Sequence, residues 1–127
     1  VTIHHVNNKI DSGPIAFQSK IENFDWTWDS KKLYKQSIIE LFKLFKSNFH
    51  KIVKNKIPKM EQGEKYKKIN FRKDMLRTST INLNSKFIAK DFLNLLRAKN
   101  FSPNYGIVFN ENKKRYSINI KIKKIKD

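Results

Sequence analysis

Hydrophobic residues between positions 31 and 54 recur at the spacing of an α-helix. At about 100° per residue they form one apolar stripe, whose members are Tyr34, Ile38, Leu41, Phe42, Phe45, Phe49, Ile52 and Val53. The opposite side is basic and consists of Lys32, Lys43, His50 and Lys54. Asp29 or Ser30 can cap the first turn, and the helix ends between Asn55 and Pro58. The pattern therefore predicts a long amphipathic helix over 31–54.

A second helix is predicted over residues 86–99. Its inward-facing positions are Ile88, Phe92, Leu95 and Leu96, and its opposite side carries Lys86, Lys90 and Arg97. Asn84 or Ser85 precedes the segment and can cap its first turn. Asn100 follows it and is suited to the left-handed conformation that ends many helices.

Three short segments have the pattern of strands: residues 78–83, 105–109 and 115–123. The last one alternates, with Tyr116, Ile118, Ile120 and Ile122 on one face and Ser117, Asn119, Lys121 and Lys123 on the other. A polar turn joins the last two strands into an antiparallel hairpin. The order helix, strand, helix, strand, strand predicts a small α+β domain, with the helices packed on one face of a short antiparallel sheet.

The two ends of the chain differ in character. Residues 1–30 are interpreted as an acidic N-terminal extension, and residues 31–127 as a basic domain with a surface insertion at about 55–75. Trp26 and Trp28 lie two positions apart, and acidic residues flank them. They are candidate anchors that pack the extension onto a surface or onto a partner protein. The local negative charge argues against base stacking by these rings.

The charge of the chain favours a polyanionic partner. The sequence has 28 Lys and Arg against 11 Asp and Glu, for a formal net charge of +17. Residues 1–30 carry a net −2, so residues 31–127 carry +19. Such a domain repels itself, and nucleic acid is the natural partner. No membrane contact is expected, because no apolar run is long enough to span a bilayer and the bases are spread over every element.

Residues that could carry catalysis or bind a metal are scarce. The chain has no Cys and only three His, of which His4 and His5 are adjacent and point apart in an extended segment. Acidic residues are scattered singly, and with three Gly there is no glycine-rich phosphate loop. We therefore expect no metal, no cofactor and no enzyme activity. A small basic nuclease or toxin, or another nucleic-acid-binding protein, stays open as an alternative.

Two stretches resemble a known family. One runs from Ile38 through Asn48, and the other comprises Ile81 to Lys86, Ile88, Phe92, Leu95-Leu96, Asn100-Phe101 and Tyr105. Together they resemble the N-terminal half of the small-subunit ribosomal protein eight family, which has a helix, a strand, a Ser-Lys turn, a second helix and a hairpin in this order. A weaker resemblance exists to the large-subunit ribosomal protein twenty-two family.

The resemblance implies a structural component of the ribosomal small subunit that binds rRNA and helps assembly. The implied RNA-binding residues are Lys43, Lys46, Asn48, Ser85, Lys86, Lys90, Arg97, Lys121 and Lys123. Neighbouring ribosomal proteins would contact the N-terminal extension, and a second chain could supply the C-terminal half that the family has and this sequence lacks. Lys, Asn, Ile and Phe, which have A/T-rich codons, make up 64 of 127 residues. This composition favours a mitochondrial ribosome, and a cytoplasmic or other organellar ribosome stays open as an alternative.

Overall fold

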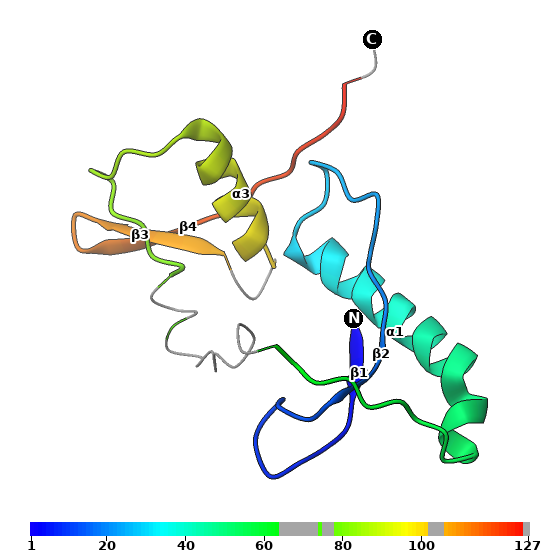
Figure 1. The fold of residues 1–127 in the computed structure, drawn as a ribbon. Coiled ribbons are helices and arrows are strands. Elements are labelled where there is room, and N and C mark those ends of the chain that lie inside the picture. Colours follow the sequence, from blue (N-terminus) through cyan, green and yellow to red (C-terminus); the bar gives the residue numbers. More distant parts are fainter. Residues whose placement is uncertain (64–73, 75–77, 102–105, 126–127) are drawn as a thin grey trace. The chain divides into compact units, whose positions relative to one another are not determined.

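The computed structural model describes residues 1–63, 74, 78–101 and 106–125 (Figure 1). The chain forms two compact units. Unit 1 consists of Val1–Asn23 and Lys35–Ile69, and unit 2 consists of Phe24–Tyr34 and Asn70–Asp127. Each unit is described separately below. In the described part of the chain, no helix combines the length and the apolar character that crossing a membrane would require.

Unit 1 contains a two-stranded antiparallel sheet formed by β1 (Thr2–His4) and β2 (Ile15–Gln18). Ile3 pairs with Phe17, and the register shifts after Ile3. An isolated bridge joins Ile15 to Met60 on the other side of β2. The only buried hydrophobic side chains among the described residues of this unit belong to β2, namely Ala16 and Phe17. This sheet lies within residues 1–30, for which the sequence predicts only an extension. The strands were not predicted because three and four residues leave almost no periodicity to detect.

The loop between β1 and β2 depends on Gly13. A Cβ built on Gly13 would collide with the carbonyl oxygen of His5, and no rotamer can relieve this because the backbone fixes the position of both atoms. The His5 amide donates a hydrogen bond to the Pro14 carbonyl at 2.9 Å, and the Gln62 side chain donates to the Gly13 carbonyl. Glycine is therefore required here for close backbone approach.

Helix α1 spans Ser30–Val53, close to the predicted 31–54. The Asp29 carboxylate accepts a hydrogen bond from the Lys32 amide at 2.8 Å, as an N-cap does. At the other end Asn55 has φ of 52°, and the Lys56 amide donates to the Lys51 carbonyl at 2.8 Å. This is the Schellman arrangement, which satisfies the last carbonyls of the helix.

The side of α1 that is most covered within unit 1 is not its apolar stripe. The half-buried positions include Ser37, Glu40, Leu44 and Asn48, and Glu40 accepts a hydrogen bond from the Ser19 hydroxyl at 2.7 Å. The apolar stripe is largely exposed, reaching 66% at Phe42 and 68% at Val53, and α1 has no buried residue. The predicted stripe therefore exists, but residues 35–53 do not bury it within their own unit.

Unit 2 contains α3 (Ala89–Lys99) and a hairpin of β3 (Ile107–Glu111) and β4 (Lys114–Ile118) (Figure 1). Asn112 and Lys113 form the turn with φ of 48° and 61°, the left-handed values that a two-residue type I′ turn requires. Phe109 pairs with Tyr116, and their stacked rings lie 5.1 Å apart. Ile107 on β3, 1% exposed, and Leu96 on α3 form the buried apolar core of the described part of this unit.

Several predicted details of unit 2 are wrong. Neither Asn84 nor Ser85 caps a helix: both belong to a turn in which Asn82 accepts their amide hydrogens. Helix α3 starts after Ile88, which makes no side-chain cap, and Asn100 at its end has φ of −78° rather than a left-handed value. The residues before α3 fold into a turn because the Asn82 side chain competes for backbone amides.

The α+β class predicted from the sequence is confirmed. The sheet is divided into two separate two-stranded hairpins, however, one in each unit. The predicted strand at 78–83 is represented by a single parallel bridge between Thr80 and Val108, and β4 ends at Ile118 rather than at residue 123. The insertion predicted at 55–75 lies partly outside the described residues.

Candidate functional site

Arg97 on α3 holds the segment that leads into α1. Its Nε donates to the Trp28 carbonyl at 3.0 Å and its Nη2 to the Asp25 carbonyl at 2.7 Å. Its Nη1 donates to Asn94 Oδ1 at 3.1 Å. The guanidinium also lies 4.7 Å from the centre of the Trp26 ring, a cation–π distance. The planar fork of Arg97 is thus occupied by contacts inside unit 2.

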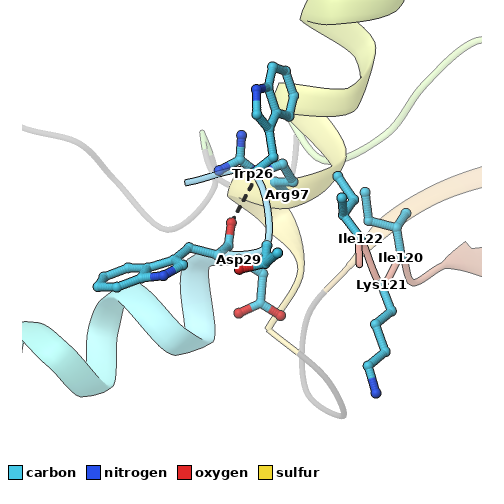
Figure 2. Close-up of a pocket in the computed structure, with 8 residues that line it drawn as sticks. Trp26, Asp29, Arg97, Ile120, Lys121 and Ile122 are labelled. Atoms are coloured by element: carbon cyan, nitrogen blue, oxygen red, sulfur yellow. Dashed lines mark hydrogen bonds between the residues drawn. The ribbon is translucent and has the colours of Figure 1, made fainter. Parts of the chain in front are cut away.

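A hollow lies beside this clamp (Figure 2). It is lined by Trp26, Thr27, Trp28, Asp29, Arg97, Ile120, Lys121 and Ile122. Its volume is about 40 Å³, enough for roughly two or three water molecules. In Figure 2 the Lys121 side chain points away from Trp26 and Arg97. The hollow is therefore too small to hold a sugar or a nucleotide.

Asn100 connects three segments of unit 2. Its buried side-chain amide donates to the Asp29 carboxylate at 2.8 Å and to the Ile120 carbonyl at 2.9 Å. Its own carbonyl accepts a hydrogen bond from the Ser30 hydroxyl at 2.8 Å. These bonds fix the first turn of α1 and the segment after β4 to the end of α3. A buried polar side chain whose amide donates to two partners helps to specify one arrangement of the segments that it joins.

The Asp25 carboxylate carries a perturbed pKa. The Thr27 hydroxyl donates to Asp25 Oδ1 at 2.6 Å and the Thr27 amide at 2.8 Å. These bonds stabilise the charged form, so they hold the pKa of Asp25 below its ordinary value of 3.8, and the charges of Lys32 and Lys124 act in the same direction. Asp25 is exposed, and the arrangement stabilises a turn rather than forming a reactive centre.

His4 and His5 support the loop between β1 and β2. His4 Nδ1 is 3.0 Å from the His5 carbonyl, and His5 Nε2 is 2.9 Å from the Pro58 carbonyl, so both nitrogens act as donors. His4 Nε2 lies 3.7 Å from the Asp11 carboxylate. That distance is within the range of a surface ion pair when the imidazole is protonated, but it exceeds a hydrogen bond.

No group of three or more metal-ligating side chains gathers in the ranges that the structure describes.

The residues predicted to bind RNA are divided between the two units. Lys43, Lys46 and Asn48 lie on the part of α1 that belongs to unit 1, where Lys43 is 3.7 Å from Glu40 and the Asn48 amide donates to the Leu44 carbonyl. Unit 2 holds the others, which are Ser85, Lys86, Lys90, Arg97, Lys121 and Lys123. All of these are exposed except Arg97. RNA binding by these residues stays an untested prediction.

Two features of unit 2 were missed by the sequence reasoning. The structural role of Arg97 was missed because its spacing placed it on the outer side of α3 with two lysines. The role of Asn100 was missed because a terminal Asn is more often a backbone cap than a buried connector. One signal in the sequence could have indicated the role of Arg97: the rings of Trp26 and Trp28 need packing partners, and an arginine guanidinium packs favourably on a tryptophan ring.

Comparison with known proteins finds one family model that matches part of unit 2. The family model of the N-formyltransferase dimerization C-terminal domain matches residues 74–124, which lie in unit 2. No curated protein matches the sequence.

Solved structures match nearly the whole chain. A sugar N-formyltransferase from a Shewanella species matches with a TM-score of 0.85 and 21% identity, over 98% of this chain and 50% of that one. A 4-N formyltransferase from Francisella tularensis matches with a TM-score of 0.88 and 22% identity, over 98% of this chain and 51% of that one. At this identity the matches show the fold alone, and the chain spans about half the length of these structures.

These matches overturn the ribosomal interpretation. The resemblance to the ribosomal protein eight family was wrong, and the twenty-two family, the nuclease and the nucleic-acid-binding alternatives gain no support either. The features that carried the resemblance, an amphipathic helix with a polar residue before it and a hairpin after it, occur in many folds. The capping role assigned to Ser85 within that motif is also absent.

Two further predictions fall with it. The expected partners, rRNA and ribosomal proteins, are wrong, since the matched family model describes a dimerization domain of N-formyltransferases. The prediction that the chain has no part in an enzyme is wrong, because the matched family and structures are transferases. The mitochondrial location stays an untested prediction.

Proposed function

We propose that this chain is the C-terminal half of an N-formyltransferase that acts on an amino sugar, and that unit 2 holds two copies of the protein together. The match of residues 74–124 to the dimerization domain of N-formyltransferases carries this proposal. The formyl transfer itself belongs to the complete protein. The contribution of unit 2 is to set the oligomeric state.

The surface of unit 2 supports self-association. Exposed hydrophobic side chains lie along the segment that enters α3 and in the first half of α3 itself, and they are Leu83, Phe87, Ile88 and Leu93. Ile88 is 72% exposed, and the ring of Phe87 lies 5.0 Å from that of Phe92. Clustered apolar side chains of this kind mark interfaces more often than free surface. Burying them against a second copy removes them from water.

Light scattering coupled to size-exclusion chromatography tests this function. The chain is expected to elute with twice the 15.2 kDa mass of one copy. Ile88→Asp is the informative variant, because Asp introduces a charge at the interface while being a favourable N-cap for α3. Losing a central apolar contact of about 2 kcal/mol should raise the dissociation constant roughly thirtyfold.

Asn84→Asp is the matched control for Ile88→Asp. It adds the same charge to the same exposed segment without removing an apolar contact, so the dimer should persist. A wild-type chain that remains a monomer at high micromolar concentration would contradict the proposed function. Equal dissociation of both variants would place the interface elsewhere.

A further inference from the structure

One side of α1 in unit 1 carries a line of lysines. Residues 35–53 form one continuous helix (Figure 1), and at about 100° per residue these lysines lie within about 100° of one another. The Lys54 amide donates to the His50 carbonyl at 3.2 Å, so the helical path continues to the last of them. His50 lies on the same side. We call this set the α1 basic line, and its members, all exposed, are Lys35, Lys43, Lys46 and Lys54.

The positive charge of the α1 basic line is not neutralised by neighbouring carboxylates. Glu40 is the only acidic residue of α1, and it is half-buried and accepts a hydrogen bond from the Ser19 hydroxyl at 2.7 Å. Its carboxylate lies 3.7 Å from Lys43 Nζ, and the Lys43 side chain is 64% exposed, so this surface pair contributes little. Within the described part of the chain, the other three lysines form no ion pair. The line therefore presents its charge to solvent.

The geometry of the line suits a flat surface of diffuse negative charge. Lys35 and Lys54 are 19 positions apart, and this separation corresponds to about 28 Å along a helix. All members are lysines, whose ammonium groups are point charges on flexible stems, and none is an arginine, whose planar fork matches a phosphate geometrically. No aromatic residue belongs to the line, so it offers no ring on which a base could stack. These features favour a bilayer surface over a polynucleotide.

We propose that the α1 basic line is a docking surface for an anionic phospholipid membrane. Four or more basic residues on an amphipathic helix are typical of such surfaces. Each lysine that reaches the membrane surface raises partitioning roughly fivefold, so the four together give a weak, reversible association that salt screens.

Membrane contact was not expected from the sequence, because its bases are spread over every predicted element. In the structure, four of them share one side of a single helix. The docking surface lies in unit 1, whereas the family model of the dimerization domain matches residues 74–124 in unit 2. This inference therefore stands independently of the proposed function.

Vesicle co-sedimentation of the full-length protein tests the proposal. The probes are vesicles with about 30% phosphatidylglycerol in phosphatidylcholine and vesicles of phosphatidylcholine alone, at about 50 mM salt. The test variant changes the four lysines of the line to glutamine. The matched control removes the same charge from unit 2 by changing four other exposed lysines to glutamine, namely Lys113, Lys114, Lys121 and Lys123.

We expect the wild type to bind only the vesicles that contain phosphatidylglycerol. The test variant should bind them more weakly by a factor on the order of a hundred or more, and the control by less than about fivefold. Changing the same four lysines to arginine keeps the charge and should keep the binding. Lys46→Glu, which alters a single exposed side chain and so preserves the fold, should weaken binding roughly 25-fold.

Three outcomes would overturn the proposal. The first is a wild type that does not bind the anionic vesicles. The second is an equal loss in the test variant and the control, which would assign the binding to net charge alone. The third is tighter binding to a single-stranded RNA than to the anionic vesicles at the same salt, which would assign the line to a polynucleotide.

Discussion

The guanidinium of Arg97 lies 4.7 Å from the centre of the Trp26 ring while its Nε donates to the carbonyl of Trp28 at 3.0 Å. One side chain of α3 thus holds both the ring and the backbone of the segment that precedes α1. Arg97→Ala should destabilise unit 2 by about 1–3 kcal/mol, since two carbonyls and the ring lose their partner. Urea unfolding followed by tryptophan fluorescence measures the loss, because Trp26 and Trp28 both lie in unit 2.

Arg97→Lys should recover only a minority of that stability, because an ammonium cannot donate along the directions of the guanidinium fork. Lys90→Ala is the control on the same helix: its side chain is exposed, and the expected change is within about 0.5 kcal/mol. An unchanged unfolding midpoint for Arg97→Ala would show that the clamp adds nothing to stability.

Asn100→Asp should destabilise unit 2 more at neutral pH than in acid. The amide of Asn100 donates to Asp29 and to Ile120, and a carboxylate can only accept. We expect a loss of about 2–3 kcal/mol at pH 7, and a smaller loss near pH 4, where one of the two neighbouring carboxyls is protonated and can donate. Chemical unfolding at both pH values measures this difference.

The matched control is Asn110→Asp, on an exposed position of β3. Its stability should stay within about 0.5 kcal/mol of the wild type at both pH values. A loss for Asn100→Asp that is the same at pH 4 and pH 7 would argue against carboxylate repulsion as the cause.

Gly13→Ala should weaken the β1–β2 sheet of unit 1. The added Cβ would collide with the His5 carbonyl oxygen, and the backbone must move to admit it. We expect a cost of about 1–3 kcal/mol or more. Amide hydrogen exchange at Ile3 and Phe17 measures it, because these residues pair across the sheet.

Gly106→Ala is the control for this prediction. Its added Cβ would lie 3.0 Å from the nearest atom, the Ile118 carbonyl oxygen, so a small shift suffices. Exchange at Ile3 and Phe17 should not change, since Gly106 belongs to unit 2. Unchanged exchange in Gly13→Ala would show that the loop adjusts freely.

Thr27→Ala should raise the pKa of Asp25 toward its ordinary value of 3.8. The Thr27 hydroxyl supplies the largest contribution to the lowered pKa, and the Thr27 amide remains in the variant. Because the folded-state pKa is lowered, the stabilisation is present above pH 3.8 and is lost as pH falls through the folded value. Carboxyl chemical shifts followed by NMR during acid titration measure the pKa. Thr27→Ser keeps the hydroxyl and should keep the low pKa, whereas equal values in both variants would exclude the side-chain bond as its cause.

Local patterns predicted the local structure well. The spacing of apolar residues located α1 to within one residue at each end, and the polar turn before residue 115 located the hairpin. Helix caps were less predictable, since Asp29 acts as expected but Ser85 does not. Strands β1 and β2 are too short for their alternation to stand out from a loop.

The candidate site was poorly predicted because its residues are defined by contacts between distant segments. Arg97 and Trp28 are 69 positions apart, and Asn100 and Asp29 are 71 apart. Both lie in unit 2, where these contacts join the start of α1 to α3. Neither pair is marked by a periodic pattern or a short motif.

The sequence by itself determined that the chain is α+β, that residues near 31–54 form an amphipathic helix, and that the last strands form a hairpin. Those features depend on interactions within a few residues. Only the tertiary structure decided that the apolar stripe of α1 faces away from its own unit, that Arg97 is occupied by backbone carbonyls, and that the fold is that of N-formyltransferases rather than a ribosomal protein. The physical reason is that helical periodicity records which residues share a side, whereas the element that covers that side is chosen by long-range packing.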